Sequence, residues 1–360
     1  MTIPENHEVR LRGAWQGRIS GCMLGKAVEL FSMREGHASL TEYLNAVNAL
    51  PLRDYIPYDS AHASRHIFKP SCKSQMTSSL PDDDINYSVL ALMALEAHGV
   101  HLTTTDIARQ WLKYLPLAST FTAERAAYKT LLEHGHEWFP EGHDLGFEIA
   151  QCADNPYNEW IGAQIRADVY GWVCPGNPKL AVYLAEQDAA LSHRAEGIYG
   201  AVFVAALGAL LGGDRPLPAA VDEALAYIPS TSRCTQAVKM AQQLSDQIDG
   251  GDKIRDFFGD MSVVHTVNNL GLLAWALLRY ENDFDAAIGE VVAAGLDTDC
   301  NGATVGALWA LQGKPIPGHW AQPWQGQVGL SLAGMDQLPL QSLVHRTMDV
   351  TRRFADQTAP

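Results

Sequence analysis

The sequence predicts a compact all-α protein, and three observations carry this prediction. Apolar residues recur at α-helical spacing over long stretches of the chain, whereas the alternation typical of β-strands is scarce. Several of these stretches are rich in alanine and apolar on nearly all sides, as is typical of helices buried inside a large helical domain. Helix-start signals precede some of them, at Thr105 with Asp106 and at Asp283.

The expected helices follow one another along the chain without a repeat of fixed period, so a solenoid is not expected. After a glycine-rich first helix, the helical pattern occupies seven windows: residues 85–99, 105–115, 179–191, 197–213, 234–248, 266–280 and 283–295.

The first helix, expected over residues 13–29, carries a glycine at every fourth position: Gly13, Gly17, Gly21 and Gly25. Residues four apart lie on one face of a helix, so these glycines form a seam along which another backbone can approach closely. Charged side chains interrupt the segment and exclude a membrane-spanning dimer, so close packing inside a bundle is the expected role. At the fifth position of the series stands Glu29, either an exposed residue at a helix end or a functional group.

Length and composition favour one large domain over residues 1–360, because 47% of the 360 residues are hydrophobic and no clear linker divides them. The net charge of -15 disfavours nucleic acids and anionic membranes as partners, since either would repel the protein surface. The six cysteines show no C-x-x-C spacing and are expected to be reduced thiols. The amino-terminal segment has no apolar signal-peptide core, and no later apolar run is expected to span a membrane. A cytoplasmic protein is therefore expected.

The longest loop-like stretch runs from about residue 51 to residue 81 and is rich in serine, proline and histidine. It leads directly into a strong acidic motif. We therefore interpret it as a loop beside the active site rather than as a domain boundary.

The first acidic motif places three consecutive carboxylates, Asp82, Asp83 and Asp84, at the beginning of the helix expected from residue 85. Acidic residues in a first helical turn complement the helix dipole and cap free N–H groups, and one or two would satisfy that role. Three adjacent carboxylates repel one another, and a bound cation relieves that repulsion. This motif alone favours capping and metal binding about equally.

The second acidic motif is the pair Asp297 and Asp299, which flanks Thr298 after the window 283–295. We expect the pair in a non-helical turn, where carboxylates two residues apart can converge on one hard cation, although a loop or helix-cap role is the alternative. Five carboxylates at two helix beginnings, with oxygen donors only, favour Mg²⁺ or Mn²⁺ over zinc.

Together these motifs resemble those of a known family. The segments GRISGCMLGKAVE (17–29), PDDDINYSVLAL (81–92), SHRAEGIYGAVFVAAL (192–207) and GLDTDCNGATVGALWALQG (295–313) resemble, in this order, the signatures of ADP-ribosylglycohydrolases related to the dinitrogenase reductase-activating glycohydrolase. The resemblance extends from about residue 13 to residue 313. It implies an orthogonal multi-helix bundle of the ADP-ribosylglycohydrolase type, which holds two divalent cations, Mg²⁺ or Mn²⁺, in a cleft for ADP-ribose. The implied reaction is hydrolysis at C1 of the distal ribose of an ADP-ribosylated protein or a small ADP-ribosyl compound.

The resemblance also implies roles for individual residues. The implied metal ligands are Asp82, Asp83, Asp84, Asp297 and Asp299, with Cys300 at the position of a further ligand. The implied catalytic residues are Glu29, Asp83 and Asp299, and the implied substrate-binding residues are Gly162, Arg166 and His193. The alternatives are that Arg166 pairs with Asp168 or another buried acid, and that His193 belongs to a helix-capping region.

Two positions depart from the family pattern: Asp82 replaces a hydroxyl ligand, and Cys300 replaces a threonine or serine. A thiol is a soft donor that is mostly protonated near neutral pH, so its sulfur is not expected to bind Mg²⁺. The departure at Cys300 leaves open a protein of the same fold that binds ADP-ribose without turnover. An all-α isoprenoid synthase is a further alternative, because Asp82, Asp83 and Asn86 imitate the D-D-x-x-[DN] motif, although a convincing second metal motif is missing.

The expected mechanism has two cations that orient the ribose hydroxyls and supply water to the anomeric carbon, with Glu29 as gate or proton acceptor. The leaving group is a modified arginine or serine on a protein, a nucleic-acid end or a small metabolite, and the sequence does not select among these.

Overall fold

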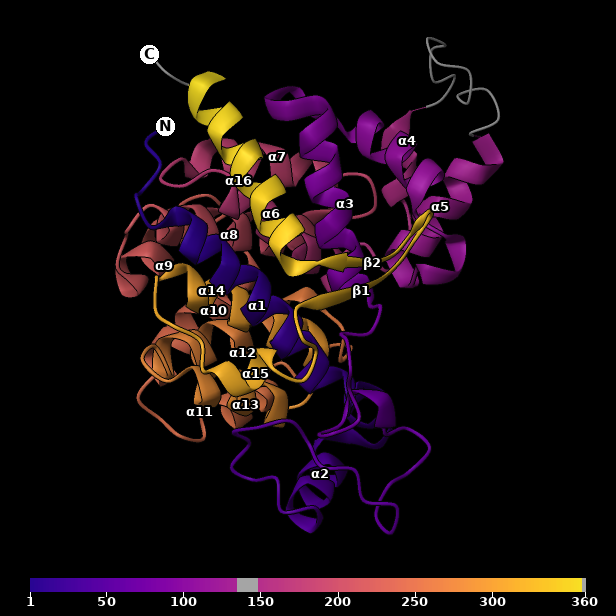
Figure 1. Ribbon diagram of the computed structural model, residues 1–360, viewed down its shortest axis with the longest axis vertical. Helices are drawn as coiled ribbons and strands as arrows, with labels where there is room; N and C mark the ends of the chain where they lie inside the picture. Colours follow the sequence, from indigo (N-terminus) through magenta and orange to yellow (C-terminus); the bar gives the residue numbers. More distant parts are fainter. Residues whose placement is uncertain (135–147, 358–360) are drawn as a thin grey trace.

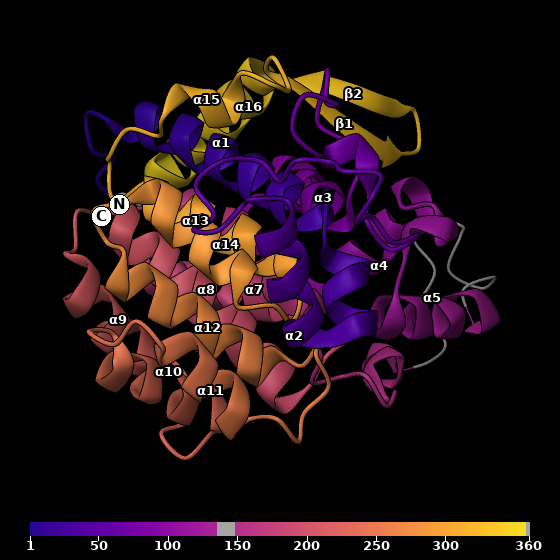
Figure 2. The same ribbon diagram turned by 90° about the horizontal axis from the view of Figure 1, so that it is seen from below.

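Helices make up nearly all of the regular structure in the computed structural model, which describes residues 1–134 and 148–357 (Figure 1). The helices are stacked in layers (Figure 2). α16 (Leu340–Gln357) covers the outer side of α1 (His7–Lys26), and α14 (Thr298–Leu311) lies on its inner side. Behind α14 lie α8 (Ala195–Gly212) and α12 (Thr266–Arg279), which contact it directly. The all-α prediction is therefore confirmed.

All seven predicted helical windows form helices. Those not yet named are α3 (Asp83–His98), α4 (Thr104–Tyr114), α7 (Pro178–Ala189), α10 (Arg233–Leu244) and α13 (Phe284–Ala293). Asp283 caps α13 as predicted, because its side chain accepts a hydrogen bond from the backbone N–H of Ala286. The N-cap residue of α4 is Thr103 rather than Thr105, since Thr103 and Asp106 form a reciprocal capping box.

The remaining elements did not stand out in the sequence. The further helices are α2 (Glu29–Ala46), α5 (Thr122–His134), α6 (Asp168–Trp172), α9 (Leu217–Leu225), α11 (Gly250–Phe257) and α15 (Gly318–Ala321). The short 3₁₀ segments are η1 (Lys69–Ser71), η2 (Gly99–His101), η3 (Leu117–Ser119), η5 (Ile149–Ala153) and η6 (Ile161–Arg166).

The glycine seam of α1 packs against α14, backbone on backbone. It faces a second series of small residues spaced by four, and the facing pairs are Gly13 with Ala310, Gly17 with Gly306, Gly21 with Gly302 and Gly25 with Thr298. A Cβ added at Gly21 would lie 1.9 Å from the carbonyl oxygen of Gly302. Only glycine fits there, so the predicted close packing is confirmed.

α1 ends at Lys26, and Glu29 begins α2 instead, so the prediction that Glu29 belongs to the first helix is wrong. A continuing helix would bond the N–H of Glu29 to the carbonyl of Gly25. That carbonyl already accepts hydrogen bonds from the N–H of Val28 at 2.9 Å and from the hydroxyl of Thr298 at 2.8 Å. The contact between α1 and α14 thus turns the chain and sets the direction of α2.

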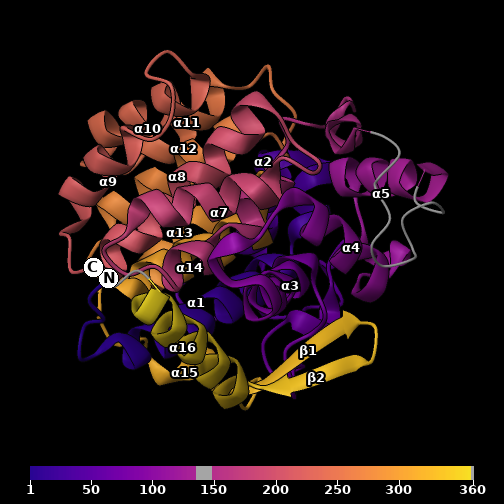
Figure 3. The same ribbon diagram turned by 90° about the horizontal axis from the view of Figure 1, so that it is seen from above.

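A small β-hairpin formed by β1 (Gln327–Leu332) and β2 (Met335–Pro339) is the one sheet in the described part of the chain (Figure 3). It packs on α3, where the side-chain amide of Asn86 bonds the Ser331 hydroxyl at 2.8 Å and accepts from the N–H of Ser331 at 3.0 Å. The sequence did not predict it, because β2 is largely exposed and its short segment has no clear alternation.

α8 is long and apolar enough to cross a membrane, so the expectation that no such segment exists is wrong for this helix. In the structure 78% of the segment is buried inside the fold. A core helix of a large protein has the same composition.

Candidate active site

A cavity of about 670 Å³ lies where the first turns of α2, α3 and α14 meet. One part of its wall is acidic and consists of Glu29, Asp82, Asp83, Asp297 and Asp299, together with Cys300 and Lys26. Another part is largely apolar and includes Leu30, Met33, Phe121, Ile161, Val263 and Val264. The fold therefore brings together the two acidic motifs, which are far apart in the sequence. The loop at 51–81 reaches the cavity at its last residue, Pro81.

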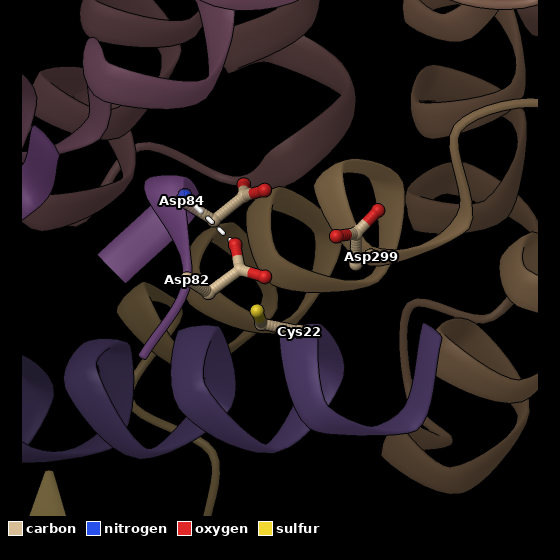
Figure 4. Close-up of side chains that lie close together, drawn as sticks. All are labelled: Cys22, Asp82, Asp84 and Asp299. Atoms are coloured by element: carbon tan, nitrogen blue, oxygen red, sulfur yellow. Dashed lines mark hydrogen bonds between the residues drawn. The ribbon is translucent and has the colours of Figure 1, made fainter. Parts of the chain in front are cut away.

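Asp82 is already engaged within the protein. It is the N-cap of α3, and its Oδ1 accepts a hydrogen bond of 2.9 Å from the N–H of Asp84 (Figure 4). Its Oδ2 lies 2.5 Å from the Nζ of Lys26. Burial raises the pKa of the Asp82 carboxyl, but the Lys26 ammonium outweighs this effect and holds the pKa below its usual value. The capping role that the motif suggested is present.

Asp84 does not line the cavity, unlike the other two acids of its motif. Its Oδ1 lies 3.2 Å from Nη2 of Arg18, which is fully buried and also pairs with Asp168 at 2.7 Å. Asp168 is thus the partner of Arg18 rather than of Arg166. The Oδ2 of Asp84 is buried and has no hydrogen-bond partner among the described residues. Asp84 therefore joins α3 to α1 and keeps one oxygen for another ligand.

The second acidic pair sits at the beginning of α14. Asp297 is its N-cap residue and Asp299 lies in its first turn, so the expected non-helical turn is wrong for Asp299. In each carboxylate Oδ1 is buried and has no hydrogen-bond partner within residues 1–134 and 148–357. Burial, followed by Asp299, raises the pKa of Asp297 well above its usual value. Burial and Asp82 raise the pKa of Asp299 to about 6.

Two overlapping groups of side chains have ligand atoms within 4.8 Å of one another. One group consists of Asp297, Asp299 and Cys300, and the other of Cys22, Asp82, Asp84 and Asp299 (Figure 4). Buried carboxylate oxygens without partners fit a hard divalent cation, whose charge would favour the ionised acids and reverse the pKa shifts. The oxygen donors fit Mg²⁺ or Mn²⁺.

The Cys300 thiol lies in the first of these groups but is a poor ligand for such an ion. Burial and the neighbouring Asp297 raise its pKa well above the usual value, so the sulfur stays protonated. That Cys300 does not bind Mg²⁺ stays a prediction.

Glu29 is half-buried and lines the cavity from the first turn of α2. Burial raises the pKa of its carboxyl well above the usual value, and Asp299 and Asp82 raise it further. A carboxylate whose pKa is raised is a stronger base than an ordinary glutamate, which suits proton transfer.

The three residues expected to bind substrate have different environments. Gly162 lines the cavity, and a Cβ there would lie 2.0 Å from Oε1 of Glu124. Arg166 and His193 do not line it, and both are buried. The expected diphosphate contact of Arg166 has no support in this geometry, because its guanidinium is enclosed by Glu124 at 2.7 Å and Asp188 at 2.7 Å. The alternative of a buried acidic partner holds instead.

His193 is packed behind the cavity wall. Its Nδ1 lies 2.8 Å from the Ser192 hydroxyl, which in turn accepts a hydrogen bond of 2.9 Å from Nη2 of Arg166. Burial and the nearby Arg166 lower the pKa of His193 well below its usual value, so the ring is neutral. His193 does not line the cavity, and its expected contact with substrate stays a prediction.

Three charged residues of the cavity wall were missed by the sequence analysis: Lys26, Arg34 and Glu124. Lys26 follows the last glycine of the seam, a position that could have drawn attention to it. Arg34 lies within the second helix, which the sequence did not predict, and Glu124 lies in α5, where no motif marks it.

Comparison with known proteins gives the family and the fold of the chain. A family model described as ADP-ribosylglycohydrolase matches residues 4–353. A solved structure described as an ADP-ribosylglycohydrolase-related protein complex is similar with a TM-score of 0.62 and 16% sequence identity, over 98% of this chain and 100% of that chain. A similarity at this level of identity shows the fold. None of the curated proteins matches this sequence.

Proposed function

The chain belongs to the ADP-ribosylglycohydrolase family, and from this premise we propose that it is a divalent-cation-dependent hydrolase of ADP-ribosyl conjugates. The bond cleaved is the glycosidic bond at C1 of the distal ribose. The substrate is an ADP-ribosylated protein or a small ADP-ribosyl compound.

One observation carries this proposal. The acids that begin α3 and α14 meet around one cavity, together with Glu29 from α2. Asp297 and Asp299 keep buried oxygens without partners, although burial of a carboxylate without compensation is unfavourable. An arrangement of this kind is stable when a cation compensates the charge, and it leaves Asp83 and Glu29 facing the substrate space.

The chemistry follows from these groups. A bound divalent cation supplies charge that activates water and stabilises the hydroxyls of the ribose. Water attacks C1, the bond between C1 and the leaving atom breaks, and its electron pair goes to the leaving atom. In this proposal Glu29, which lines the same cavity, accepts the proton that the attacking water loses, and the leaving atom takes up a proton as it departs. In this proposal Asp83, which lines the cavity, stabilises the developing positive charge of the sugar ring, and Asp299 helps to hold the cation.

The rest of the cavity suits a nucleotide. Arg34 lines it and is exposed, with no hydrogen bond or ion pair found for its guanidinium in the described part of the chain. Arginine binds phosphate groups through several parallel N–H donors. Phe121 is 52% exposed and Leu30 is 48% exposed on the same cavity, so an aromatic and an aliphatic surface are available for a base. We assign the diphosphate contact to Arg34.

The decisive experiment is a turnover assay in which ADP-ribose release is measured from arginine-linked, serine-linked, nucleic-acid-linked and small-molecule ADP-ribosyl substrates, with Mg²⁺, Mn²⁺ or excess chelator. Cation-dependent release from at least one substrate is expected, and the linkage cleaved identifies the acceptor.

Tight ADP-ribose binding without release from any substrate would instead identify the non-catalytic alternative, in which the fold keeps its ligand and has lost turnover. The isoprenoid-synthase alternative has no support in the family match, and its Asn86 is engaged with Ser331 of the hairpin.

A further inference from the structure

Lys26 is the cationic side chain nearest to the acids of the site. It ends α1 directly after the glycine seam, and its Nζ lies 2.5 Å from Oδ2 of Asp82. On its other side the ring of Phe68 lies below the ammonium, with 5.4 Å between Nζ and the ring centroid. The side chain is only 17% exposed. The ammonium is therefore held in one place by an ion pair and a cation–π contact.

The backbone fixes this position as well. The N–H of Phe68 donates a hydrogen bond of 2.9 Å to the carbonyl of Ala27, which ties the loop at 51–81 to the end of α1. The glycine seam in turn fixes the end of α1 against the beginning of α14. Lys26 is thus a fixed part of the cavity wall rather than a mobile surface lysine.

The two groups of candidate ligands differ in how much positive charge the protein already supplies. In the group of Cys22, Asp82, Asp84 and Asp299, Lys26 pairs with Asp82, and Arg18 pairs with Oδ1 of Asp84, whose Oδ2 keeps no partner among the described residues. Both oxygens of Asp82 have partners, because the second caps α3. In the group of Asp297, Asp299 and Cys300, no lysine or arginine pairs with either carboxylate within the residues described.

Electrostatics then favours one divalent cation and not two. A divalent ion placed against Asp82 would lie within a few ångströms of an ammonium group, and like charges at such separations repel by several kcal/mol at a protein surface. An ion placed between Asp297 and Asp299 meets two carboxylates whose Oδ1 atoms are buried without partners.

We propose that the ammonium group of Lys26 takes the place of one of the two divalent cations that the family resemblance implies, so that the site binds a single divalent cation at Asp297 and Asp299. Asp82 stands where the family resemblance implies a hydroxyl, and the ammonium of Lys26 neutralises the carboxylate at this position. This inference rests on the proposed function for the presence of a cation, but it concerns the number of ions and the role of Lys26.

The test counts bound ions directly. Mn²⁺ binding to the full chain is measured by equilibrium dialysis. The protein is then saturated with excess Mn²⁺, the free ion is removed by dialysis, and the electron paramagnetic resonance spectrum of the bound ion is recorded. The wild type is expected to bind one Mn²⁺ per chain, with the six-line spectrum of an isolated ion. Lys26→Met removes the ammonium and keeps the length of the side chain, so it is expected to bind two Mn²⁺ ions whose spectra are exchange-coupled.

The matched control is Arg34→Met, which removes one positive charge from the same cavity without touching Asp82. It should still bind one Mn²⁺. Lys26→Gln serves as a second variant if Lys26→Met does not fold. The number of Mn²⁺ ions bound per wild-type chain tests the inference even if neither variant folds. Two coupled ions in the wild type, no bound ion in the wild type, or one ion in folded Lys26 variants would each overturn the inference.

The outcome is separable from that of the proposed function. Two ions in a wild-type protein that releases ADP-ribose leave the proposed function intact and overturn the role of Lys26. A single ion in a protein that cleaves no ADP-ribosyl substrate supports the role of Lys26 and removes the proposed reaction.

Discussion

Arg166 and Asp188 form a buried ion pair, in which Nε of the guanidinium donates to Oδ1 of the carboxylate at 2.7 Å. The same guanidinium pairs with Glu124, whose carboxylate reaches the cavity wall. Arg166 therefore acts on the site through Glu124, whereas Arg34 faces the cavity itself.

Substitution of Arg34 should therefore weaken ligand binding, whereas substitution of Arg166 should reduce the stability of the fold. Arg34→Met is expected to weaken ADP-ribose binding about tenfold, the loss of a charged hydrogen bond of about 1.5 kcal/mol, with an unchanged free energy of unfolding. Arg166→Met leaves two buried carboxylates without their partner and should reduce the free energy of unfolding by about 3–5 kcal/mol. Calorimetric titration with ADP-ribose and urea unfolding measure the two effects. Equal binding by Arg34→Met and wild type would remove Arg34 from the diphosphate site.

Removal of the Asp299 carboxylate should abolish both turnover and the stabilisation of the fold by Mn²⁺. A ligand that binds only the folded state raises its melting temperature by mass action, and Asp299 belongs to both groups of candidate ligands. Asp299→Ala is compared with Cys300→Ser by thermal melting with and without Mn²⁺. Cys300→Ser should keep the stabilisation and the activity, because the protonated thiol is not expected to bind the ion. Loss of the response in Cys300→Ser with retention in Asp299→Ala would contradict this description of the site.

Glu29→Gln tests the proton acceptor. The amide has the size of the carboxyl but cannot accept a proton from water, so kcat should fall by about 10²–10⁴. The dissociation constant of ADP-ribose should stay within a few-fold, as expected for an interaction made mainly in the transition state. Steady-state kinetics and calorimetric titration provide both values. An unchanged kcat would show that the proton goes elsewhere.

Gly21→Ala tests the contact between α1 and α14. The added methyl group would lie 1.9 Å from the carbonyl oxygen of Gly302, and the clash should cost more than about 3 kcal/mol of unfolding free energy despite the better helix propensity of alanine. Gly318→Ala is the control, because nothing lies within 4 Å of a Cβ there, and it should change stability by less than about 0.5 kcal/mol. Urea unfolding followed by circular dichroism compares them.

His7 should make the fold sensitive to acid. Its Nε2 lies 3.0 Å from the carbonyl oxygen of Trp172, and burial lowers its pKa from 6.5 to about 4. Between these values the unfolded chain binds the proton and the folded chain does not, so stability falls as the pH falls from 6.5 towards 4. The loss reaches about 3 kcal/mol, or about 1.4 kcal/mol for each pH unit.

The measurement is the unfolding free energy as a function of pH between 7.5 and 4.5. His7→Gln should reduce the proton uptake on unfolding by about one proton in this range. The exposed His101 provides the control, since His101→Gln should keep the wild-type slope. An identical slope in His7→Gln would show that His7 is protonated in the folded state.

The local pattern of apolar residues was enough to predict most of the core helices and the positions of the two acidic motifs. The windows that became α3, α8 and α12 are apolar at helical spacing, and the two acidic motifs were placed by recognising that each stands at the beginning of a helix. The seam of α1 was predicted from its spacing, but the second series of small residues that faces it in α14 was not, because Gly302 and Gly306 have small neighbours that hide this series. Side-chain partners such as those of Lys26 and Arg166 depend on contacts between distant segments, which one sequence does not encode as a local pattern.

The contact between Gly21 and Gly302 limits how this protein can change over evolutionary time. Where side chains separate two helices, substitutions can alter the spacing in steps as small as one methylene group. Here the two main chains are in contact, so no single substitution can bring the helices closer together. A substitution that moves the helices apart also moves Lys26, at the end of α1, away from Asp299, in the first turn of α14. New substrate preferences are therefore expected to arise by substitution in α2, in α5 and in the hairpin around Ser331, while the helix pair stays unchanged. A saturation mutagenesis map should show a contiguous intolerant stripe along α1 and α14, surrounded by a permissive rim.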